Sequence, residues 1–251
     1  MAKAKWKHVW ITGASSGLGE HAARILADEG CHVSISARSE DKLNAIASSP
    51  NISAHPLDVT DPEACRRVVS EIEAEHGPID LALFSAGAWF PGKITDLQVE
   101  NFAKTINVNL MGVVHCLDAV MAGMLERKAG HVAWVASVAG YGGLPNSASY
   151  GSSKAALIHL AESAKPELAQ KGITVSVVNP GFVKTDMTAN NDFPMPFLME
   201  VEDAARDMVE GLKQEKFEVT FPWQLVRILK TLNLLPYRAY FGIIRRFVLR
   251  N

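Results

Sequence analysis

Short apolar runs alternate along this chain with longer stretches in which apolar residues recur at helical spacing. Some of the short runs are apolar at consecutive positions, as over 81–84 and 175–178, which is typical of strands covered on both faces. The runs predict strands over 8–12, 32–37, 52–57, 79–85, 131–137, 173–179 and 217–221. The intervening stretches predict helices over 17–29, 39–48, 61–76, 97–127, 149–171 and 201–214. This alternation predicts an α/β fold, a doubly wound parallel sheet of about seven strands with helices on both faces.

Composition and charge narrow the class of protein. The chain has 251 residues, of which 48% are apolar and 21% charged, and no linker divides it, so we expect a single domain over 1–251. The net charge of −2 gives no reason to expect a nucleic-acid partner. We find no apolar run near the roughly 20 residues that span a bilayer. No apolar segment follows the basic N-terminus, as it would in a signal peptide.

The cysteines give a further indication of the compartment. Cys31, Cys65 and Cys116 are scattered, with neither metal-ligand spacing nor the even number of a disulfide framework. Their pattern is typical of a reducing environment, and we expect a cytoplasmic protein without a catalytic metal.

A glycine-rich turn, T-G-A-S-S-G-L-G over 12–19, directly follows the first predicted strand. Glycines let the backbone approach a pyrophosphate, and the helix that begins there offers free N–H groups and a positive dipole end. The spacing G-x-x-x-G-x-G differs from the common G-x-G-x-x-G pattern, and a glycine triplet alone can be a tight turn. Its place between strand and helix favours a Rossmann-type dinucleotide site. The residues expected to line this site are Gly13, Ser15, Ser16, Gly17, Leu18 and Gly19.

The end of the second predicted strand indicates which dinucleotide binds. An acidic residue there would bind a ribose 2′-hydroxyl and repel a 2′-phosphate, but the chain has Ala37 followed by Arg38 and Ser39. A guanidinium is a natural phosphate partner, so we expect NADP(H), although a solvated arginine beside a helix cap is the alternative. Asp58, next to Val59, is either a partner for the adenine amino group or a turn residue.

Ser137, Tyr150 and Lys154 are the candidate catalytic group. Tyr150 and Lys154 are four residues apart and share one face of a helix, where an ammonium would lower the pKa of the phenol. Ser137 ends a predicted strand at the edge where open α/β sheets bind ligands. Each residue alone has a structural explanation, as a packed aromatic, a solvated charge or a strand end. Together they predict proton transfer at a carbonyl or alcohol.

The chain resembles the short-chain dehydrogenase/reductase family in its form of about 250 residues. The resemblance covers 8 to about 186 and rests on the glycine turn, Asp58-Val59, N-V-N-L over 107–110, Ser137, the Tyr150–Lys154 pair and N-P-G-F-V-K-T over 179–185. It implies that Tyr150 is the general acid or base, that Lys154 lowers the Tyr150 pKa and holds the nicotinamide ribose, and that Ser137 orients the substrate oxygen. It further implies that Asn109 opens its helix locally and holds a water that connects Lys154 to solvent. The residues implied to face the nicotinamide are Pro180, Gly181, Val183 and Thr185.

One stretch departs from the family pattern. The fourth strand of the family usually ends N-N-A-G, whereas this chain has Phe84-Ser85-Ala86-Gly87. Ala86 and Gly87 still leave room for the adenosine ribose, but the amides that brace neighbouring strands are lost and Ser85 replaces only some of their hydrogen bonds. We expect altered packing around Phe84, in which Trp134 takes part.

Two segments late in the chain bear on substrate and partners. The predicted lid over 186–200 is apolar (Met187, Phe193, Met195, Phe197, Leu198 and Met199), which fits either an apolar substrate or closure on the protein itself. Residues 221–251, called the arm below, carry six basic residues and no acidic one, which leaves −8 on the rest of the chain. Apolar residues recur at helical spacing on both sides of Pro236 (Leu225, Ile228, Leu229 and Leu232, then Tyr237, Phe241, Ile244 and Val248). The arm therefore predicts either packing on protein or peripheral contact with a membrane surface.

These features predict an NADP(H)-dependent oxidoreductase that interconverts an apolar ketone or aldehyde with its alcohol. One alternative is a non-catalytic NADP(H) sensor or scaffold, which would need only the glycine turn and Arg38. Another is a membrane-surface reductase of lipid-borne carbonyls. The family resemblance further implies a homodimer or homotetramer formed through the helices that hold Asn109 and Tyr150.

Overall fold

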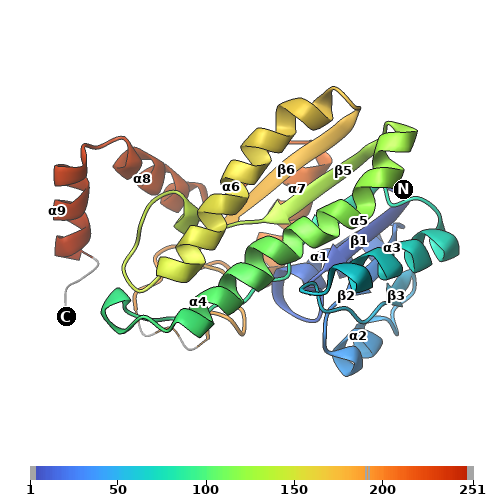
Figure 1. Cartoon of the computed structure of the whole chain (residues 1–251), viewed down its shortest axis with the longest axis horizontal. Coiled ribbons are helices and arrows are strands. Elements are labelled where there is room, and N and C mark those ends of the chain that lie inside the picture. Colours follow the sequence, from blue (N-terminus) through green and yellow to red (C-terminus); the bar gives the residue numbers. More distant parts are fainter. Residues whose placement is uncertain (1–3, 190, 192, 248–251) are drawn as a thin grey trace.

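All seven predicted strands pair in one parallel sheet with the order β3-β2-β1-β4-β5-β6-β7 (Figure 1). The structure is a computed structural model that describes residues 4–189, 191 and 193–247. The strands are β1 (His8–Thr12), β2 (His32–Ser36), β3 (Ile52–Ala54), β4 (Leu81–Phe84), β5 (Gly130–Val135), β6 (Ile173–Pro180) and β7 (Glu218–Phe221). The strand order reverses between β1 and β4, which places a ligand-binding crevice at the carboxyl ends of these two strands. The predicted α/β doubly wound fold is confirmed.

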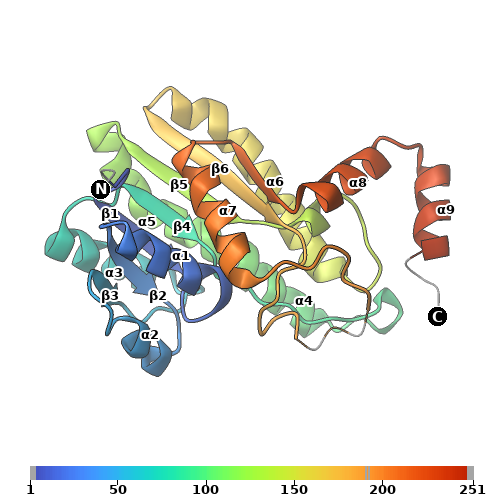
Figure 2. The ribbon, with the colours of Figure 1, turned by 180° about the vertical axis from the view of Figure 1, so that it is seen from behind.

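Helices cover both faces of the sheet. In Figure 1, α3, α4, α5 and α6 lie in front of the sheet, and Figure 2 shows α1 and α7 on the opposite face. The helices are α1 (Gly17–Asp28), α2 (Glu40–Ile46), α3 (Pro62–His76), α4 (Val99–Ile106), α5 (Gly112–Arg127), α6 (Ala148–Ala169), α7 (Val201–Lys213), α8 (Trp223–Asn233) and α9 (Tyr237–Phe247). A start signal is visible at α3, where Asp61 accepts hydrogen bonds from the backbone N–H groups of Glu63 and Ala64 and Pro62 takes the first helical position.

Two apolar layers lie on the two faces of the sheet. Val9, Ile11 and Leu26 belong to the layer under α1 and α7, and Trp10 and Trp134 to the layer under α3, α5 and α6. All five side chains are fully buried. Consecutive residues of β1 thus point into different layers, which explains why the strands are apolar at consecutive positions.

Four strands end earlier than the apolar runs predict, β2 and β4 by one residue, β5 by two and β3 by three. β3 stops at Ala54, although His55 and Leu57 still donate backbone hydrogen bonds to the neighbouring segment. β5 stops at Val135, and Ser137 instead caps a short 3₁₀ turn over Val138–Gly140. Both ends leave polar residues free to face the crevice.

The long helix predicted over 97–127 is continuous from Val99 to Arg127 but is not regular. It contains a π-helical segment over Asn107–Met111 between α4 and α5. A window of this helix has a mean hydropathy of 1.6, so by length and composition it could cross a membrane, which corrects our expectation that no segment of the chain reaches that length. Its place beside α3 and α6 over the sheet gives its apolar residues a second explanation, as part of the layer that covers the strands.

The arm forms the predicted pair of helices. In both views α8 and α9 extend to one side of the sheet, away from α2 and β3 (Figures 1 and 2). α8 packs Leu225 and Val226 against Val138, whereas Ile228, on the predicted apolar stripe, is 49% exposed. In α9, Tyr240 and Ile244 are buried. Val248 and Arg250, which the sequence assigns to the arm, lie outside the described residues.

Candidate active site

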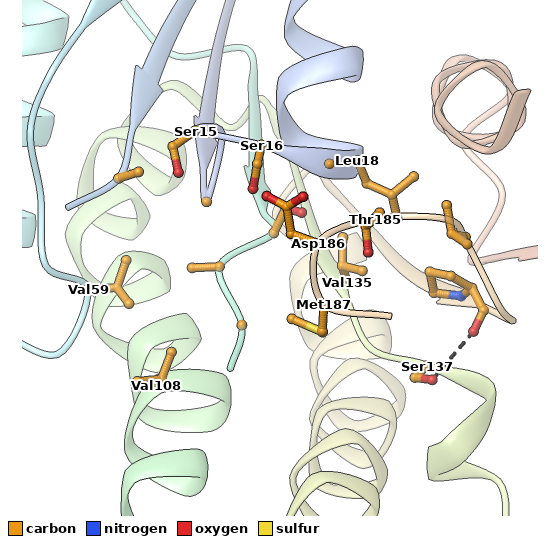
Figure 3. Close-up of a pocket in the computed structure, with 18 of the residues that line it drawn as sticks. Ser15, Ser16, Leu18, Val59, Val108, Val135, Ser137, Thr185, Asp186 and Met187 are labelled. Atoms are coloured by element: carbon orange, nitrogen blue, oxygen red, sulfur yellow. Dashed lines mark hydrogen bonds between the residues drawn. The ribbon is translucent and has the colours of Figure 1, made fainter. Parts of the chain in front are cut away.

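A cavity of about 340 Å³ opens at the carboxyl ends of the strands. It spans the point between β1 and β4 where the strand order reverses. Figure 3 shows side chains from the β1–α1 turn, from the π-helical segment after α4, from β5 and from the segment after β6 around this one space. The predicted site residues that line it are Gly13, Ser15, Ser16, Gly17, Leu18, Arg38, Ser39, Asp58, Val59, Ser85, Ala86, Gly87, Ser137, Tyr150, Lys154, Pro180, Gly181, Val183 and Thr185. Gly19 and Asn109 lie behind the wall rather than on it.

The glycine turn is shaped by close backbone contacts. Gly13 has a φ of +69°, and a Cβ there would lie 2.5 Å from the backbone of Ala86 at the end of β4. A Cβ on Gly19 would lie 2.5 Å from the Gly13 carbonyl oxygen, so this glycine lets α1 begin close to β1. Only glycine fits both positions. The turn leaves the N-terminus of α1 facing the cavity, as an anion site requires.

Arg38 and Asp58 stand at one end of the cavity. Both side chains are exposed, and the Asp58 carboxylate accepts 2.9 Å and 2.8 Å hydrogen bonds from the backbone N–H and hydroxyl of Thr60. Burial raises the pKa of Asp58, but the Thr60 hydrogen bonds and the Arg38 charge outweigh it and leave that pKa below its usual value. Asp58 is therefore both a turn residue and an acceptor at the cavity, so the two interpretations of its role are compatible.

The altered end of β4 packs as an aromatic cluster. Phe84 is buried edge-on against Trp10, with ring centroids 5.8 Å apart, and it is the register partner of Trp134 on β5. Trp134 in turn donates a hydrogen bond to the Leu157 carbonyl in α6. Among the described residues, the buried hydroxyl of Thr12 beside Phe84 has no hydrogen-bond partner. The structure agrees with the expected repacking around Phe84, with Trp134 in the same layer.

Ser137 and Tyr150 meet across the loop that joins β5 to α6. The Ser137 hydroxyl lies 3.4 Å from the Pro180 carbonyl oxygen, drawn as the dashed line in Figure 3, and it accepts a hydrogen bond from the Ala139 N–H. It also hydrogen-bonds the Tyr150 hydroxyl, which lowers the phenol pKa, but burial acts more strongly in the opposite direction. The net pKa of Tyr150 is raised.

Lys154 lies one helical turn beyond Tyr150. Its Nζ is 5.4 Å from the centre of the Tyr150 ring and donates a 2.7 Å hydrogen bond to the Val135 carbonyl. Burial lowers the pKa of Lys154 to about 7. Desolvation dominates both groups in the protein alone, leaving the phenol protonated and the amine only partly charged at neutral pH. The lowering of the Tyr150 pKa by Lys154 stays a prediction.

Asn109 explains the irregularity in the long helix. It lies inside the π-helical segment and is fully buried. Its amide accepts from the Ala88 N–H at 2.7 Å and donates to the Ala88 carbonyl and to Ser153 Oγ, both at 3.0 Å. The side chain thus joins the β4 loop to α6, one residue before Lys154. The structure agrees with the local opening of the helix, while the water between Asn109 and Lys154 stays a prediction.

Comparisons with known proteins identify this arrangement. The family described as short chain dehydrogenase matches residues 7–194. An uncharacterized oxidoreductase of Myxococcus xanthus is 38% identical over 98% of this chain and 99% of its own length. The chain belongs to the short-chain dehydrogenase family. A second uncharacterized oxidoreductase, from Staphylococcus epidermidis, is 36% identical but covers 85% of this chain.

Several solved structures share this fold. ElxO with NADP bound superimposes with a TM-score of 0.77 and 29% identity over 86% of this chain and 97% of its own. An actinorhodin polyketide ketoreductase variant with NADPH superimposes with a TM-score of 0.78 and 26% identity over 88% of this chain and 97% of its own. A short-chain dehydrogenase from Streptomyces avermitilis gives 0.83 over 96% of this chain and 97% of its own, and at 24% identity it supports the fold alone.

Several residues of this short-chain dehydrogenase line the cavity without having been predicted as cofactor or catalytic residues, although 186–188 belong to the predicted lid. Asp186 and Met187 point into it from the segment after Thr185 (Figure 3), and Val108 projects from the π-helical segment. The others are Ala37, Leu57, Val135, Ala136 and Thr188. The sequence signal for Asp186 was its place directly after the N-P-G-F-V-K-T motif. The small apolar residues of the cavity wall have no sequence pattern that would identify them as site residues.

The protein has a row of aromatic rings beside Tyr150. Trp89 lies 6.3 Å from Tyr150 and 6.3 Å from Phe193, and Phe193 lies 5.9 Å from Phe182, measured between ring centroids. Phe193 belongs to the predicted lid, and the neighbouring lid residues Asn190 and Asp192 lie outside the described residues. Met199, near the end of the lid, forms a β-bridge with Val183. Its N–H donates to the Phe182 carbonyl, and its carbonyl accepts from the Lys184 N–H.

Proposed function

We propose that this short-chain dehydrogenase is an NADP(H)-dependent oxidoreductase that interconverts an apolar ketone or aldehyde with its alcohol. The observation that carries the proposal is that Ser137, Tyr150 and Lys154 line the same cavity as the glycine turn. A site for proton transfer therefore adjoins a site shaped for a dinucleotide. Two of the solved relatives, ElxO and the polyketide ketoreductase, are described as bound to NADP or NADPH.

The cavity lining fits NADP(H) along its length. The turn at Gly13 and the N-terminus of α1 would hold the pyrophosphate. Arg38, without an acidic neighbour at the end of β2, would bind the 2′-phosphate, and Asp58 would accept from the adenine amino group. The residues proposed to contact the ribose and nicotinamide are Ser85, Ala86, Gly87, Lys154, Pro180, Gly181, Val183 and Thr185.

In the reducing direction, bound NADPH would supply the hydride that the carbonyl carbon accepts. The Tyr150 hydroxyl gives its proton to the oxygen as the C=O bond becomes an alkoxide, and Ser137 holds that oxygen. The raised pKa of Tyr150 keeps the phenol protonated for this step. Lys154, fixed to the Val135 carbonyl, would hold the ribose hydroxyls and balance the phenolate that forms.

The surroundings of Tyr150 support an apolar substrate. Trp89, Phe182 and Phe193 form the aromatic row described above. The indole N–H of Trp89 is buried and has no acceptor among the described residues. A substrate with a flat or extended apolar body and one further acceptor oxygen would contact the rings and satisfy this N–H.

The test is the loss of NADPH absorbance at neutral pH with carbonyl compounds graded by chain length and ring size. We expect turnover to rise with apolar size, and Tyr150→Phe to lower it by about 10²–10⁴-fold while NADPH still binds. Equal NADPH binding with no turnover by either protein on any compound would support the sensor alternative instead.

The arm favours a second candidate, a reductase that acts on carbonyls at a membrane surface. Trp223 and Tyr237, at the starts of α8 and α9, are 61% and 78% exposed, and Arg227 lies over the Trp223 ring. Exposed aromatic and basic residues together are typical of elements that bind anionic lipid surfaces. Salt-sensitive co-sedimentation with anionic vesicles, lost when the chain ends at Pro222, would support this candidate.

The arm also packs on its own chain. Asn233 donates to the Tyr141 carbonyl, Tyr240 donates to the Gly143 carbonyl at 2.9 Å, and Lys230 pairs with Glu218. Tyr141 and Gly143 belong to the loop between Ser137 and Tyr150. A role in fixing that loop is therefore compatible with membrane contact through the opposite, exposed side of the helices.

We further propose that the protein forms a homodimer or homotetramer through α4, α5 and α6. Only 33% of the apolar window in the long helix is buried, and Val99 and Met111 are 72% and 38% exposed. A second copy would cover these residues, and sedimentation or light scattering would reveal it as a mass that is a multiple of 27.3 kDa.

A further inference from the structure

A polar row crosses the sheet where an apolar layer is expected. It lies on the side of β1, β2 and β3 that faces α3, the side on which Trp10 is buried. The residues of the row are His8, His32, Ser34, Ser53 and His55, and the end of α3 adds Glu75 and His76. The cavity described above does not include them, so the proposed reaction gives them no role.

Hydrogen bonds and ring contacts connect the row. His8 Nε2 lies 3.0 Å from Ser34 Oγ, which lies 3.1 Å from Ser53 Oγ. Ser53 Oγ is also 3.2 Å from His32 Nε2 and 3.1 Å from His55 Nε2. The His32 and His76 rings lie one over the other, with centroids 3.6 Å apart. Every imidazole of the row is thus held in place by a neighbour.

We propose that His55, Glu75 and His76 form a binding site for a divalent transition-metal ion of the zinc type. One ligand atom of each residue lies within 4.8 Å of those of the other two. Two imidazoles and one carboxylate are a ligand set that Zn²⁺ accepts, and such three-ligand sites keep a position for water or an added ligand. The site is new relative to the proposed oxidoreductase activity and does not depend on it.

The present geometry needs only a small adjustment to hold the ion. With metal–ligand bonds of about 2.1 Å, tetrahedral ligand atoms lie about 3.4 Å apart. His76 Nε2 and Glu75 Oε2 are already 3.4 Å apart. The separations in the cluster are at most 4.8 Å, so none has to close by more than about 1.4 Å, and the exposed Glu75 side chain, 56% accessible, is free to rotate toward the imidazoles.

Ser53 prepares His55 for this role. Metal-bound histidines usually engage their second ring nitrogen in a hydrogen bond that fixes the ring and its tautomer. His55 Nε2 already contacts Ser53 Oγ at 3.1 Å, so in the proposed site Nδ1 would take the ion. His55 is also buried to 8% exposure, and burial lowers its pKa, so the ring is neutral at pH 7, the form that binds metals.

The location gives the site a structural consequence. His55 follows the edge strand β3, while Glu75 and His76 end α3, and β3 and α3 lie together at the edge of the sheet (Figure 1). The segment between them contains Leu57, Asp58 and Val59, which line the dinucleotide cavity. A bound ion would therefore join the segment after β3 to the end of α3. The residues between these two points include the part of the cavity wall that is proposed to bind adenine.

The test is calorimetric titration of Zn²⁺ into tag-free, chelator-treated protein at pH 7.5. We expect one equivalent to bind more tightly than about 10 µM, with at least about tenfold loss of affinity in Glu75→Gln and His76→Gln. Glu71→Gln, one turn earlier on the same face of α3, and the remote exposed variant His159→Gln are matched controls that should leave the affinity within about threefold. Thermal unfolding in chelator should show all four variants folded.

Cobalt distinguishes this site from the buried cysteines. Cys65 and Cys116 lie 3.9 Å apart, and they offer a rival pair of soft ligands. The spectrum of the Co²⁺-loaded protein should lack a thiolate charge-transfer band. Failure to bind Zn²⁺ below about 100 µM, equal binding by Glu75→Gln and His76→Gln, or loss of binding in Cys65→Ser would each overturn the proposal, whether or not the protein oxidises NADPH.

Discussion

The Nζ of Lys154 donates a 2.7 Å hydrogen bond to the carbonyl of Val135, the last residue of β5. Among the described residues, no carboxylate forms an ion pair with this buried amine. The backbone of the sheet, rather than an opposite charge, therefore sets its position beside Tyr150. This is also why burial controls its pKa, which falls to about 7.

The pKa of Lys154 predicts how activity depends on pH. The amine is protonated below about pH 7 and neutral above it. If its charge holds the ribose and balances the phenolate, then kcat/KM for NADPH, which reports the free enzyme, falls as pH rises through about 7. Tyr150, with a raised pKa, adds no decline in this range. A profile that stays flat from pH 6 to pH 9 would contradict this role.

Replacing Arg38 should change the choice of cofactor. Arg38→Ala removes the proposed partner of the 2′-phosphate, and a hydrogen bond to a charged group contributes about 1.5–3 kcal/mol. We expect the dissociation constant for NADPH to rise by about tenfold or more, with little change for NADH, measured by fluorescence titration. Lys42→Ala removes an exposed charge on α2 outside the cavity. It is the control, and equal effects of the two substitutions would argue against phosphate binding by Arg38.

Gly13→Ala should abolish dinucleotide binding and destabilise the fold. The added Cβ would lie 2.5 Å from Ala86, and the φ of +69° costs an alanine about 1–2 kcal/mol by itself. We expect a lower melting temperature and no measurable NADPH binding. Gly242→Ala, on α9 with nothing within 4 Å of the new Cβ, should bind NADPH normally. Wild-type binding by Gly13→Ala would show that the turn does not need glycine.

The contacts of the arm predict an effect on substrate binding. The double variant Asn233→Ala, Tyr240→Phe removes the hydrogen bonds to Tyr141 and Gly143. Because that loop joins Ser137 to Tyr150, we expect KM for the carbonyl to rise several-fold while NADPH affinity is unchanged. Arg238→Ala, exposed on α9, should alter neither. Unchanged KM in the double variant would leave membrane contact as the better account of the arm.

The spacing of apolar residues was sufficient to predict the order of strands and helices and the parallel sheet. The run over 81–84 could be identified as doubly covered, and it forms β4, although the strand was predicted over 79–85. The limits of strands were less predictable, since β3 stops at Ala54 and β5 ends before Ser137. Those ends depend on local turns and on tertiary hydrogen bonds rather than on a periodic pattern.

The candidate site was recognisable because its residues have fixed spacing and distinctive chemistry. Tyr150 and Lys154 could be paired from the sequence, but the direction of the Tyr150 pKa could not, since desolvation depends on packing by distant elements. Asp186 lacked a pattern of its own. The His55–Glu75–His76 cluster was invisible for the same reason, because separate elements bring its residues together.

The most direct test of the central claim follows the hydride itself. NADPH carrying deuterium at both C4 positions of the reduced nicotinamide should be incubated with wild type and with Tyr150→Phe, using the best carbonyl from the panel. The account predicts alcohol with one deuterium on the former carbonyl carbon from wild type and almost none from the variant. NADPH consumed without deuterium in the alcohol, or equal labelling by both proteins, would contradict it.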